Sequence, residues 1–246
     1  MSRGRKKKLT SEEQVEVLDM MLKEPETRTL NAIRVNLKCK TEKQKELVNL
    51  IKTKDITICS GYPGSGKTYL SCAVALELLK SNPNKYKKIV LVKSVTTLKD
   101  EEIGFLKGTM KEKMEPFMYS FIGNFEKIIS RPTLENLRAN RLIEEQPLAY
   151  IRGITIDNAI IIVDETQNIS KKNLRSIMTR LGEDSKMIFL GDEEQIDIKD
   201  ASNSSLSYVM KHFKELDEVG TVFFGEDDVV RHPLIKKMEQ IFRDNP

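Results

Sequence analysis

Residues 58–71 read ICSGYPGSGKTYLS, a glycine-rich stretch between an apolar run and a helix-like run. Within it, Gly61–Thr68 fits the pattern GxxxxGK followed by Ser or Thr, which connects a strand to a helix in phosphate-binding loops. Glycines allow successive backbone N–H groups to point at an anion, and the following helix adds its positive dipole end. A turn without a ligand is the alternative, which the Lys-Thr ending and the flanking elements disfavour. The stretch therefore predicts a nucleoside triphosphate site.

The pattern also predicts roles for single residues of the loop. Lys67 is expected to reach the terminal phosphates during catalysis, and the Thr68 hydroxyl is expected to ligate Mg²⁺. The predicted cofactors are thus a nucleoside triphosphate and Mg²⁺. The nucleotide-binding residues predicted from this stretch are Gly61, Tyr62, Pro63, Gly64, Ser65, Gly66, Lys67, Thr68 and Tyr69.

Short apolar runs alternate with helical patterns, such as 68–80 and 171–181, through much of the chain. Continuous apolar strands that alternate with helices are typical of a parallel sheet covered on both faces. We therefore expect a three-layer α/β/α domain. The predicted strands are Ile56–Cys59, Lys88–Val92, Ala159–Val163, Lys186–Leu190 and Thr221–Phe224.

Residues 159–168 read AIIIVDETQN, in which an apolar strand is followed by two carboxylates. Ligands of open parallel sheets bind outside the carboxyl ends of the strands, so Asp164 should lie beside the phosphate loop. There it would hold Mg²⁺, often through water. Glu165 follows at once and can orient or deprotonate an attacking water, which favours hydrolysis over binding alone.

Residues 186–197, KMIFLGDEEQID, repeat this arrangement with Gly191, Asp192 and Gln195 just past an apolar strand. If that strand lies between the other two, its polar end faces the γ-phosphate. A Gly-Asp pair is also an ordinary turn, so chemistry alone leaves both interpretations open.

Composition restricts the class of protein. A chain of 246 residues can bury one substantial core. No apolar run approaches the roughly 18 residues that span a bilayer, and the N-terminal MSRGRKKK lacks the apolar run of a secretory signal. We therefore expect a cytoplasmic protein with no membrane partner. Three cysteines without metal-ligand spacing predict reduced thiols rather than disulfides or a zinc site.

Residues 1–40 are expected to form a basic arm and a helix that begins near Thr10, with a connector at 25–28. The arm can neutralise nucleic-acid phosphates or can be a solvated tail, and the sequence leaves both open. The net charge of +4 is concentrated in this arm, at Arg3, Arg5, Lys6, Lys7 and Lys8.

The stretch 94–157 has few strand signals and carries a series of methionines and phenylalanines. Such a series is mostly a packing surface for helices, and a groove or a subunit contact is the alternative. The series is Met110, Met114, Phe117, Met118, Phe121 and Phe125.

The three elements together resemble the first motor domain of superfamily 1 helicases, and they resemble the PhoH family more closely. The resemblance covers roughly residues 41–242, the expected domain being 41–246. Lys107 stands where the family usually has proline, and Thr166 where alanine is usual, which puts only a loop conformation in doubt. The further segments that carry the likeness are Gly104–Gly108, Arg152-Gly153, Asp164–Asn168, Gly191-Asp192, Gln195–Asp197 and Asp228–His232.

The resemblance implies a RecA-like P-loop core that binds and hydrolyses ATP with Mg²⁺, often as a ring, and that is linked to RNA or phosphate metabolism. It favours Gln195 as a sensor of the γ-phosphate. Gln44 lies where many helicases place an adenine-reading glutamine. Thr41 and Gln44 also have the spacing of a capping box, in which Gln44 would bond to its own helix start, and both interpretations stay open.

Superfamily 1 motors complete the ATP site with an arginine from a second motor domain. An arginine of this kind contributes roughly 10³–10⁵ in rate, so we expect a homo-oligomer, such as a hexameric ring, in which the arginine crosses a subunit boundary. Arg231 is the first candidate, followed by Arg180 and Arg152, and a surface ion pair is the alternative for each. The two histidines, His212 and His232, have no metal-ligand spacing and are expected to be structural.

The leading prediction is an oligomeric, Mg²⁺-dependent ATPase coupled to RNA or single-stranded DNA, with helicase-like activity unresolved. The first rival is a regulatory ATP-binding protein without a nucleic-acid partner. The second rival is a kinase, which would share the phosphate loop but release no phosphate without an acceptor.

Overall fold

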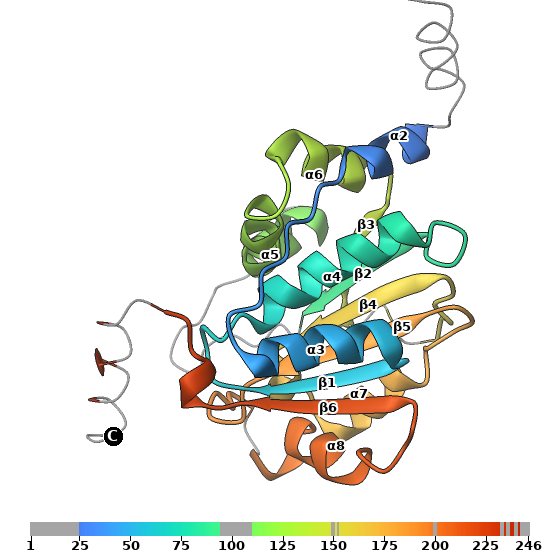
Figure 1. Cartoon of the computed structure of the whole chain (residues 1–246). Coiled ribbons are helices and arrows are strands. Elements are labelled where there is room, and N and C mark those ends of the chain that lie inside the picture. Colours follow the sequence, from blue (N-terminus) through green and yellow to red (C-terminus); the bar gives the residue numbers. More distant parts are fainter. Residues whose placement is uncertain are drawn as a thin grey trace, which may run out of the picture.

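The computed structural model describes residues 25–93, 110–148, 151, 153–198, 201–231, 234, 237, 238 and 241. Within this part of the chain, six strands are interspersed with helices (Figure 1). The strands are β1 (Ile56–Gly61), β2 (Lys88–Lys93), β3 (Ile143–Pro147), β4 (Ala159–Asp164), β5 (Lys186–Gly191) and β6 (Val219–Phe224). The helices are α2 (Pro25–Ala32), α3 (Glu42–Thr53), α4 (Lys67–Ser81), α5 (Met110–Glu126), α6 (Arg131–Ala139), α7 (Lys171–Met178) and α8 (Leu206–His212), with 3-10 turns η2 (Thr166–Asn168), η3 (Ala201–Asn203) and η4 (Glu226–Asp228).

The six strands form one parallel sheet in the order β3-β2-β4-β5-β1-β6. Strands β4 and β5 are buried along their whole length, as strands covered on both faces must be. All five predicted strands are confirmed, with ends that differ by one or two residues. Strand β5 lies between β1 and β4, which is the condition that would bring its polar end to the γ-phosphate.

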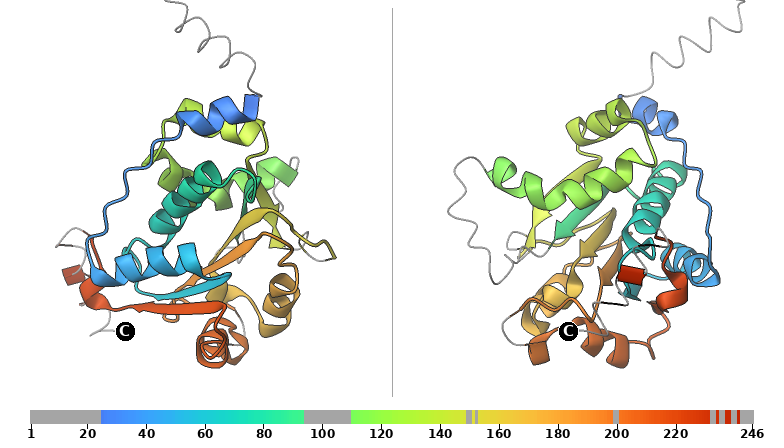
Figure 2. Two further views of the ribbon diagram at one scale, coloured as in Figure 1. Left: turned by 45° about the vertical axis from the view of Figure 1, so that its right-hand side comes forward. Right: turned by 90° about the vertical axis from the view of Figure 1, so that its left-hand side faces the viewer.

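Helices cover both faces of the sheet (Figure 2). In β4, Ile160 and Ile162 pack into a core cluster with residues of α3, α4, α5 and α6, whereas Ile161 and Val163 pack with residues of α7 and α8. The architecture is therefore the predicted three-layer α/β/α RecA-like fold, and it adds β3, α5 and α6 within the stretch where few signals were seen.

Two predictions for the helical parts have definite outcomes. Residues 25–28 are not a connector, because Pro25 begins α2, a position that suits the fixed backbone and missing N–H of proline. Three members of the Met/Phe series, Met118, Phe121 and Phe125, are buried in the core, as the packing interpretation requires. The side chains of the other three, the basic arm, the helix near Thr10 and the segment Gly104–Gly108 lie outside the described residues.

An extended strap, residues 33–40, connects α2 to α3 and runs past α4 (Figure 1). Its side chains alternate: Val35, Leu37 and Cys39 pack against the core, whereas Asn36 and Lys38 are exposed. The strap therefore carries a polar row from one end of the domain to the start of α3.

Burial raises the thiol pKa of each of the three free cysteines, Cys39, Cys59 and Cys72. Among the described residues, none of the helices is both long and apolar enough to cross a bilayer.

Candidate functional site

The predicted phosphate loop is a tight turn between β1 and α4. Gly61, Gly64 and Gly66 have φ values of 141°, 82° and 91°, a region that residues with a Cβ rarely adopt. A Cβ on Gly61 would also lie 2.3 Å from the backbone oxygen of Phe224. The loop thus requires glycine for its conformation and for the close approach of β6.

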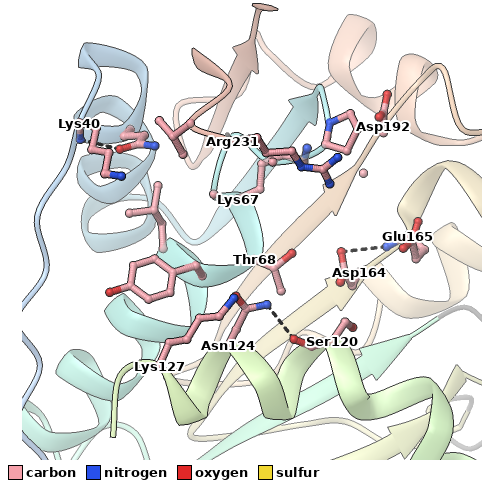
Figure 3. Close-up of a pocket in the computed structure, with 18 of the residues that line it drawn as sticks. Lys40, Lys67, Thr68, Ser120, Asn124, Lys127, Asp164, Glu165, Asp192 and Arg231 are labelled. Atoms are coloured by element: carbon pink, nitrogen blue, oxygen red, sulfur yellow. Dashed lines mark hydrogen bonds between the residues drawn. The ribbon is translucent and has the colours of Figure 1, made fainter. Parts of the chain in front are cut away.

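A pocket of about 770 Å³ opens beside this loop. Figure 3 shows residues of several elements around it, among them Lys67 and Thr68 at the start of α4, Asp164 and Glu165 at the end of β4, and Asp192 after β5. The predicted residues that line it are Gln44, Pro63, Gly64, Gly66, Lys67, Thr68, Tyr69, Asp164, Glu165, Gly191, Asp192, Gln195 and Arg231. Gly61, Tyr62 and Ser65 belong to the same loop but are not among the residues that line the pocket. Ser65 Oγ donates to the Tyr62 carbonyl oxygen at 2.8 Å, within the loop.

Lys67 begins α4 and folds back over the loop. Its Nζ donates to the carbonyl oxygens of Gly61 at 2.5 Å and Tyr62 at 2.9 Å. Burial lowers the pKa of Lys67, while Asp192 and Asp164 favour its charged form. A partly buried ammonium held by neutral carbonyls is electrostatically suited to receive an anion.

Asp164 ends β4 in a buried position across the pocket from Thr68 (Figure 3). Burial raises the pKa of Asp164 to about 6, and the neighbouring charge of Glu165 adds to the shift. One oxygen, Oδ1, accepts the backbone N–H of Glu165 at 3.1 Å.

These residues fit Mg²⁺, which is usually held by one or two carboxylates together with water and substrate phosphates. A cation would offset the desolvation of Asp164. Within the described residues no group of three Asp, Glu, His or Cys side chains could hold a metal alone. A metal at Asp164 would therefore take further ligands from the Thr68 hydroxyl and the nucleotide.

Glu165 has a left-handed backbone with φ of 56° and a carboxylate held from two sides. Its Oε2 accepts a hydrogen bond from Gln167 Nε2 at 2.8 Å, and its Oε1 lies 3.7 Å from Lys93 Nζ. Lys93 in turn donates to Ser120 Oγ at 3.0 Å, which connects Glu165 to α5. The carboxylate is therefore oriented before any ligand binds.

The turn after β5 brings Asp192 and Gln195 to the pocket. The backbone N–H of Gln195 donates to the Asp192 carbonyl oxygen at 3.2 Å, and its own carbonyl accepts from Gln167 Nε2 at 3.0 Å. Burial raises the pKa of Asp192, and its Oδ2 is buried without a hydrogen-bond partner among the described residues. An orphaned buried oxygen of this kind is suited to a cation or an ordered water.

Arg231 lines the pocket of its own chain and is exposed to solvent. A Cβ on Gly64 would lie 2.2 Å from Arg231 Nε, and the backbone N–H of Val230 donates to the Gly64 carbonyl oxygen at 3.1 Å. This contact places Arg231 beside the phosphate loop of its own chain, and the expected role across a subunit boundary stays a prediction. Arg231 comes close to Gly64 because β6 pairs with β1, so the segment that follows β6 begins beside the phosphate loop that follows β1.

The other two candidate arginines are not in the pocket. Arg180 follows α7, and its carbonyl oxygen accepts from Ile156 N at 2.9 Å, at the amino end of β4 and thus opposite the pocket. Arg152 lies outside the described residues, as does His232.

Gln44 uses both ends of its side-chain amide within the chain. Its Oε1 accepts from Lys40 N at 2.6 Å, and its Nε2 donates to the Ser65 carbonyl oxygen at 2.9 Å. Thr41 Oγ1 accepts from Gln44 N at 3.2 Å, so Thr41 is the N-cap of α3. The side chain of Gln44 bonds one residue before that cap, and it fastens the strap to the phosphate loop.

Several residues around the pocket were not predicted. The alternation of polar and apolar residues along 33–40 could have indicated the strap. Gln167 lies in the segment Asp164–Asn168 that carries the family likeness, but no role was predicted for it. No local pattern identifies Lys93 or the α5 residues, because their partners are distant in the sequence. The unpredicted lining residues are Asn36, Lys38, Lys40, Leu70, Ser120, Asn124, Lys127 and Val230.

Comparison with known proteins agrees with this geometry. The family profile described as PhoH-like protein matches residues 36–243. The chain is 34% identical over 235 residues to a PhoH-like protein of Bacillus subtilis, covering 96% of this chain and 72% of the relative. It is 33% identical over 206 residues to a PhoH-like protein of Synechocystis, covering 84% and 62%, and 32% identical over 206 residues to Protein PhoH of Escherichia coli K12, covering 80% and 56%.

Among solved structures, the large terminase of a thermophilic bacteriophage in complex with ADP aligns with a TM-score of 0.45 and 14% identity, over 81% of this chain and 49% of that chain. The assignment of the chain to a family rests on the sequence matches and not on this structural alignment. The fold, the phosphate loop and the family together support a nucleotide-binding ATPase. Because the matched profile spans most of the sequence, the chain belongs to the PhoH-like protein family.

Proposed function

We propose that this chain is a Mg²⁺-dependent ATPase. The observation that carries the proposal is the convergence of Lys67, Thr68, Asp164 and Glu165 on one pocket. A cation and glycine backbone suit phosphates, a buried carboxylate suits the metal, and a second carboxylate suits the water.

Each residue takes a defined role in this proposal. The loop amides and Lys67 bind the phosphates, and Thr68 and Asp164 hold Mg²⁺, which when bound neutralises charge on the phosphates. Glu165 orients and deprotonates the attacking water. Gln195 contacts the γ-phosphate from the turn after β5.

Arg231 supplies positive charge to the phosphates within the same chain. This role differs from the subunit-crossing role expected from the sequence, and it is supported by the packing of Arg231 on Gly64. Gln44 braces the loop, because both ends of its amide already have partners in the chain.

The wider proposal is a homo-oligomer that couples ATP hydrolysis to RNA or single-stranded DNA in the cytoplasm. The basic segment Arg3–Lys8 supports the nucleic-acid partner through phosphate neutralisation. The chain spans 56% to 72% of the three relatives compared above, so the partners of those longer proteins are no guide to this one.

Phosphate release without any acceptor tests the proposal. Turnover should require Mg²⁺, and Glu165→Gln should lower it by about 10²–10⁴-fold, the usual contribution of a general base. Lys67→Ala should abolish binding of a non-hydrolysable ATP analogue. Release that survives Glu165→Gln would contradict the assigned base.

Single-stranded RNA and DNA, added at low salt, test the coupling. We expect RNA to increase turnover, and an arm in which Arg3, Arg5 and Lys6 are replaced by Gln to weaken that increase. Unchanged turnover with both nucleic acids would favour a regulatory ATP-binding protein. Phosphate transfer to an acceptor, with no release in its absence, would favour a kinase.

A further inference from the structure

The side chain of Gln167 connects two parts of the site that come from different strands. It follows Glu165 in η2 and is fully buried, with 0% of its surface exposed. Its Nε2 donates to Glu165 Oε2 at 2.8 Å and to the Gln195 carbonyl oxygen at 3.0 Å. Its Oε1 accepts from the backbone N–H of Asp192 at 3.1 Å. One amide therefore bonds both the carboxylate after β4 and the turn after β5.

The surroundings leave Gln167 little freedom to move alone. A Cβ on Gly191 would lie 2.6 Å from Gln167 Oε1, so a larger residue there would displace the amide. From the other side, Ser204 Oγ donates to the Gln167 carbonyl oxygen at 2.9 Å, and Ser205 Oγ donates to that of Thr166 at 3.1 Å. A movement of the turn after β5 must therefore move the amide of Gln167 or break its bonds.

The carboxylate of Glu165 depends on this amide for its direction. Its other partner, Lys93, is at 3.7 Å and is also bonded to Ser120, so the Gln167 bond is the shorter of the two. This bond is part-buried, and a hydrogen bond to a carboxylate is among the stronger polar contacts. The position of Gln195 and the direction of Glu165 are thus set by the same nitrogen atom.

We propose that Gln167 is a positioning residue that couples the turn Asp192–Gln195 to the carboxylate of Glu165, so that contact of this turn with the terminal phosphate orients the water-activating group. The proposal rests on the hydrolysis proposed above. It assigns to Gln167 no contact with the nucleotide.

Three variants separate this role from a merely structural one. Gln167→Met keeps the length of the side chain and removes all three bonds. Gln167→Glu keeps the acceptor for Asp192 N and replaces the donor to Glu165 with a like charge. Asn168→Leu is the matched control. The side chain of Asn168 fastens the segment just after this turn, at Asp197, with bonds of 2.6 Å and 3.3 Å, and its replacement leaves the amide of Gln167 in place.

We expect kcat to fall about 10- to 100-fold in both Gln167 variants, the loss of one charge-assisted bond to a reacting group. We expect KM and the Kd of a non-hydrolysable ATP analogue to stay within about twofold, since a change made only in the transition state lowers kcat alone. Asn168→Leu should lower Tm comparably and lower kcat less. A kcat in Gln167→Glu equal to that of the wild type, or an equal loss in nucleotide affinity, would overturn the proposal.

A double-mutant cycle tests whether Gln167 acts through Glu165. In the Glu165→Gln background, Gln167→Met should change the residual turnover by less than about twofold, because the group it orients has lost its function. Losses that multiply would show independent roles and would contradict the coupling.

A second measurement does not depend on turnover. Hydrogen exchange of the Asp192 amide, followed by NMR, should be at least about tenfold faster in Gln167→Met than in the wild type, and unchanged in Gln167→Glu. If exchange is faster in Gln167→Met but the wild type shows no turnover, the proposal that the chain hydrolyses ATP is refuted. The proposed link between the turn Asp192–Gln195 and the amide of Gln167 is then retained. If the wild type hydrolyses ATP, and both kcat and the exchange rate are unchanged in Gln167→Met, the proposed coupling through Gln167 is refuted. The proposal of ATP hydrolysis is then retained.

Discussion

Arg231 packs so closely on Gly64 that a Cβ atom on this glycine would lie 2.3 Å from Arg231 Cγ. The two residues are distant in the sequence and meet because β6 runs beside β1. Arg231 thus packs against the phosphate loop of its own chain. It lines the pocket of that chain without any contribution from a partner subunit.

Replacement of Gly64 by alanine should weaken nucleotide binding in two ways. The φ of 82° costs a residue with a Cβ about 1–2 kcal/mol, and the new methyl group must displace Arg231. We expect affinity for an ATP analogue to fall at least about tenfold, measured by calorimetry. When Arg231→Ala is already present, Gly64→Ala should lower affinity by a smaller factor than it does in the wild type, because the clash is absent and only the backbone cost remains. Full additivity of the two changes would contradict the contact.

The location of Arg231 predicts that two inactive variants will not rescue one another. Arg231→Ala should lower turnover by about 10³-fold if the guanidinium stabilises the transferring phosphoryl group. Mixed with Glu165→Gln in refolded assemblies, it should give no more turnover than the sum of the separate variants, since each site needs both residues from one chain. Turnover well above that sum would establish donation across a subunit boundary. Wild type mixed with Glu165→Gln controls for assembly.

Much of this site could be predicted from single strands. Strands β4 and β5 are continuous apolar runs that end at Asp164 and Gly191, so their polar ends had to meet at one edge of a parallel sheet. The phosphate loop is a local pattern whose glycines are needed for its backbone. The strands and the phosphate loop are determined by residues close together in the sequence, so local sequence patterns predict them.

Other parts depend on sheet order and distant contacts, which no periodicity reveals. Strand β3 has the sequence IEEQP with one buried residue, because an edge strand needs little apolar surface. The contact of Arg231 with the phosphate loop depends on the pairing of β6 with β1, which no local pattern encodes. The bond between Lys93 and Ser120 joins residues whose segments show no common motif.

The three thiols should differ in reactivity. Cys59 and Cys72 are fully buried, whereas Cys39 is partly exposed at the end of the strap. Burial raises the pKa of all three, so less of each is thiolate at a given pH than in the unfolded chain, and labelling should rise with pH. With iodoacetamide at about pH 8, near the usual thiol pKa, mass spectrometry should find one adduct, on Cys39, in the folded protein and three after denaturation. Rapid labelling of Cys59 without unfolding would contradict the packing of β1.

The side chain of Gln44 could either brace the phosphate loop or read the nucleotide base, and a substitution at this position distinguishes the two roles. Its amide bonds Lys40 N and the Ser65 carbonyl oxygen, so these two contacts set the direction of the side chain and leave one Nε2 hydrogen and one Oε1 lone pair. We therefore expect Gln44→Leu to lower affinity for ATP and GTP by the same factor, about 5- to 30-fold for a buried carbonyl left without its donor. Thr41→Ala is the matched control, because it removes the helix cap and keeps both amide bonds. It should lower Tm with little change in nucleotide Kd. A loss confined to ATP would instead identify Gln44 as an adenine-reading residue, and the strap would then be fastened to the loop by other contacts.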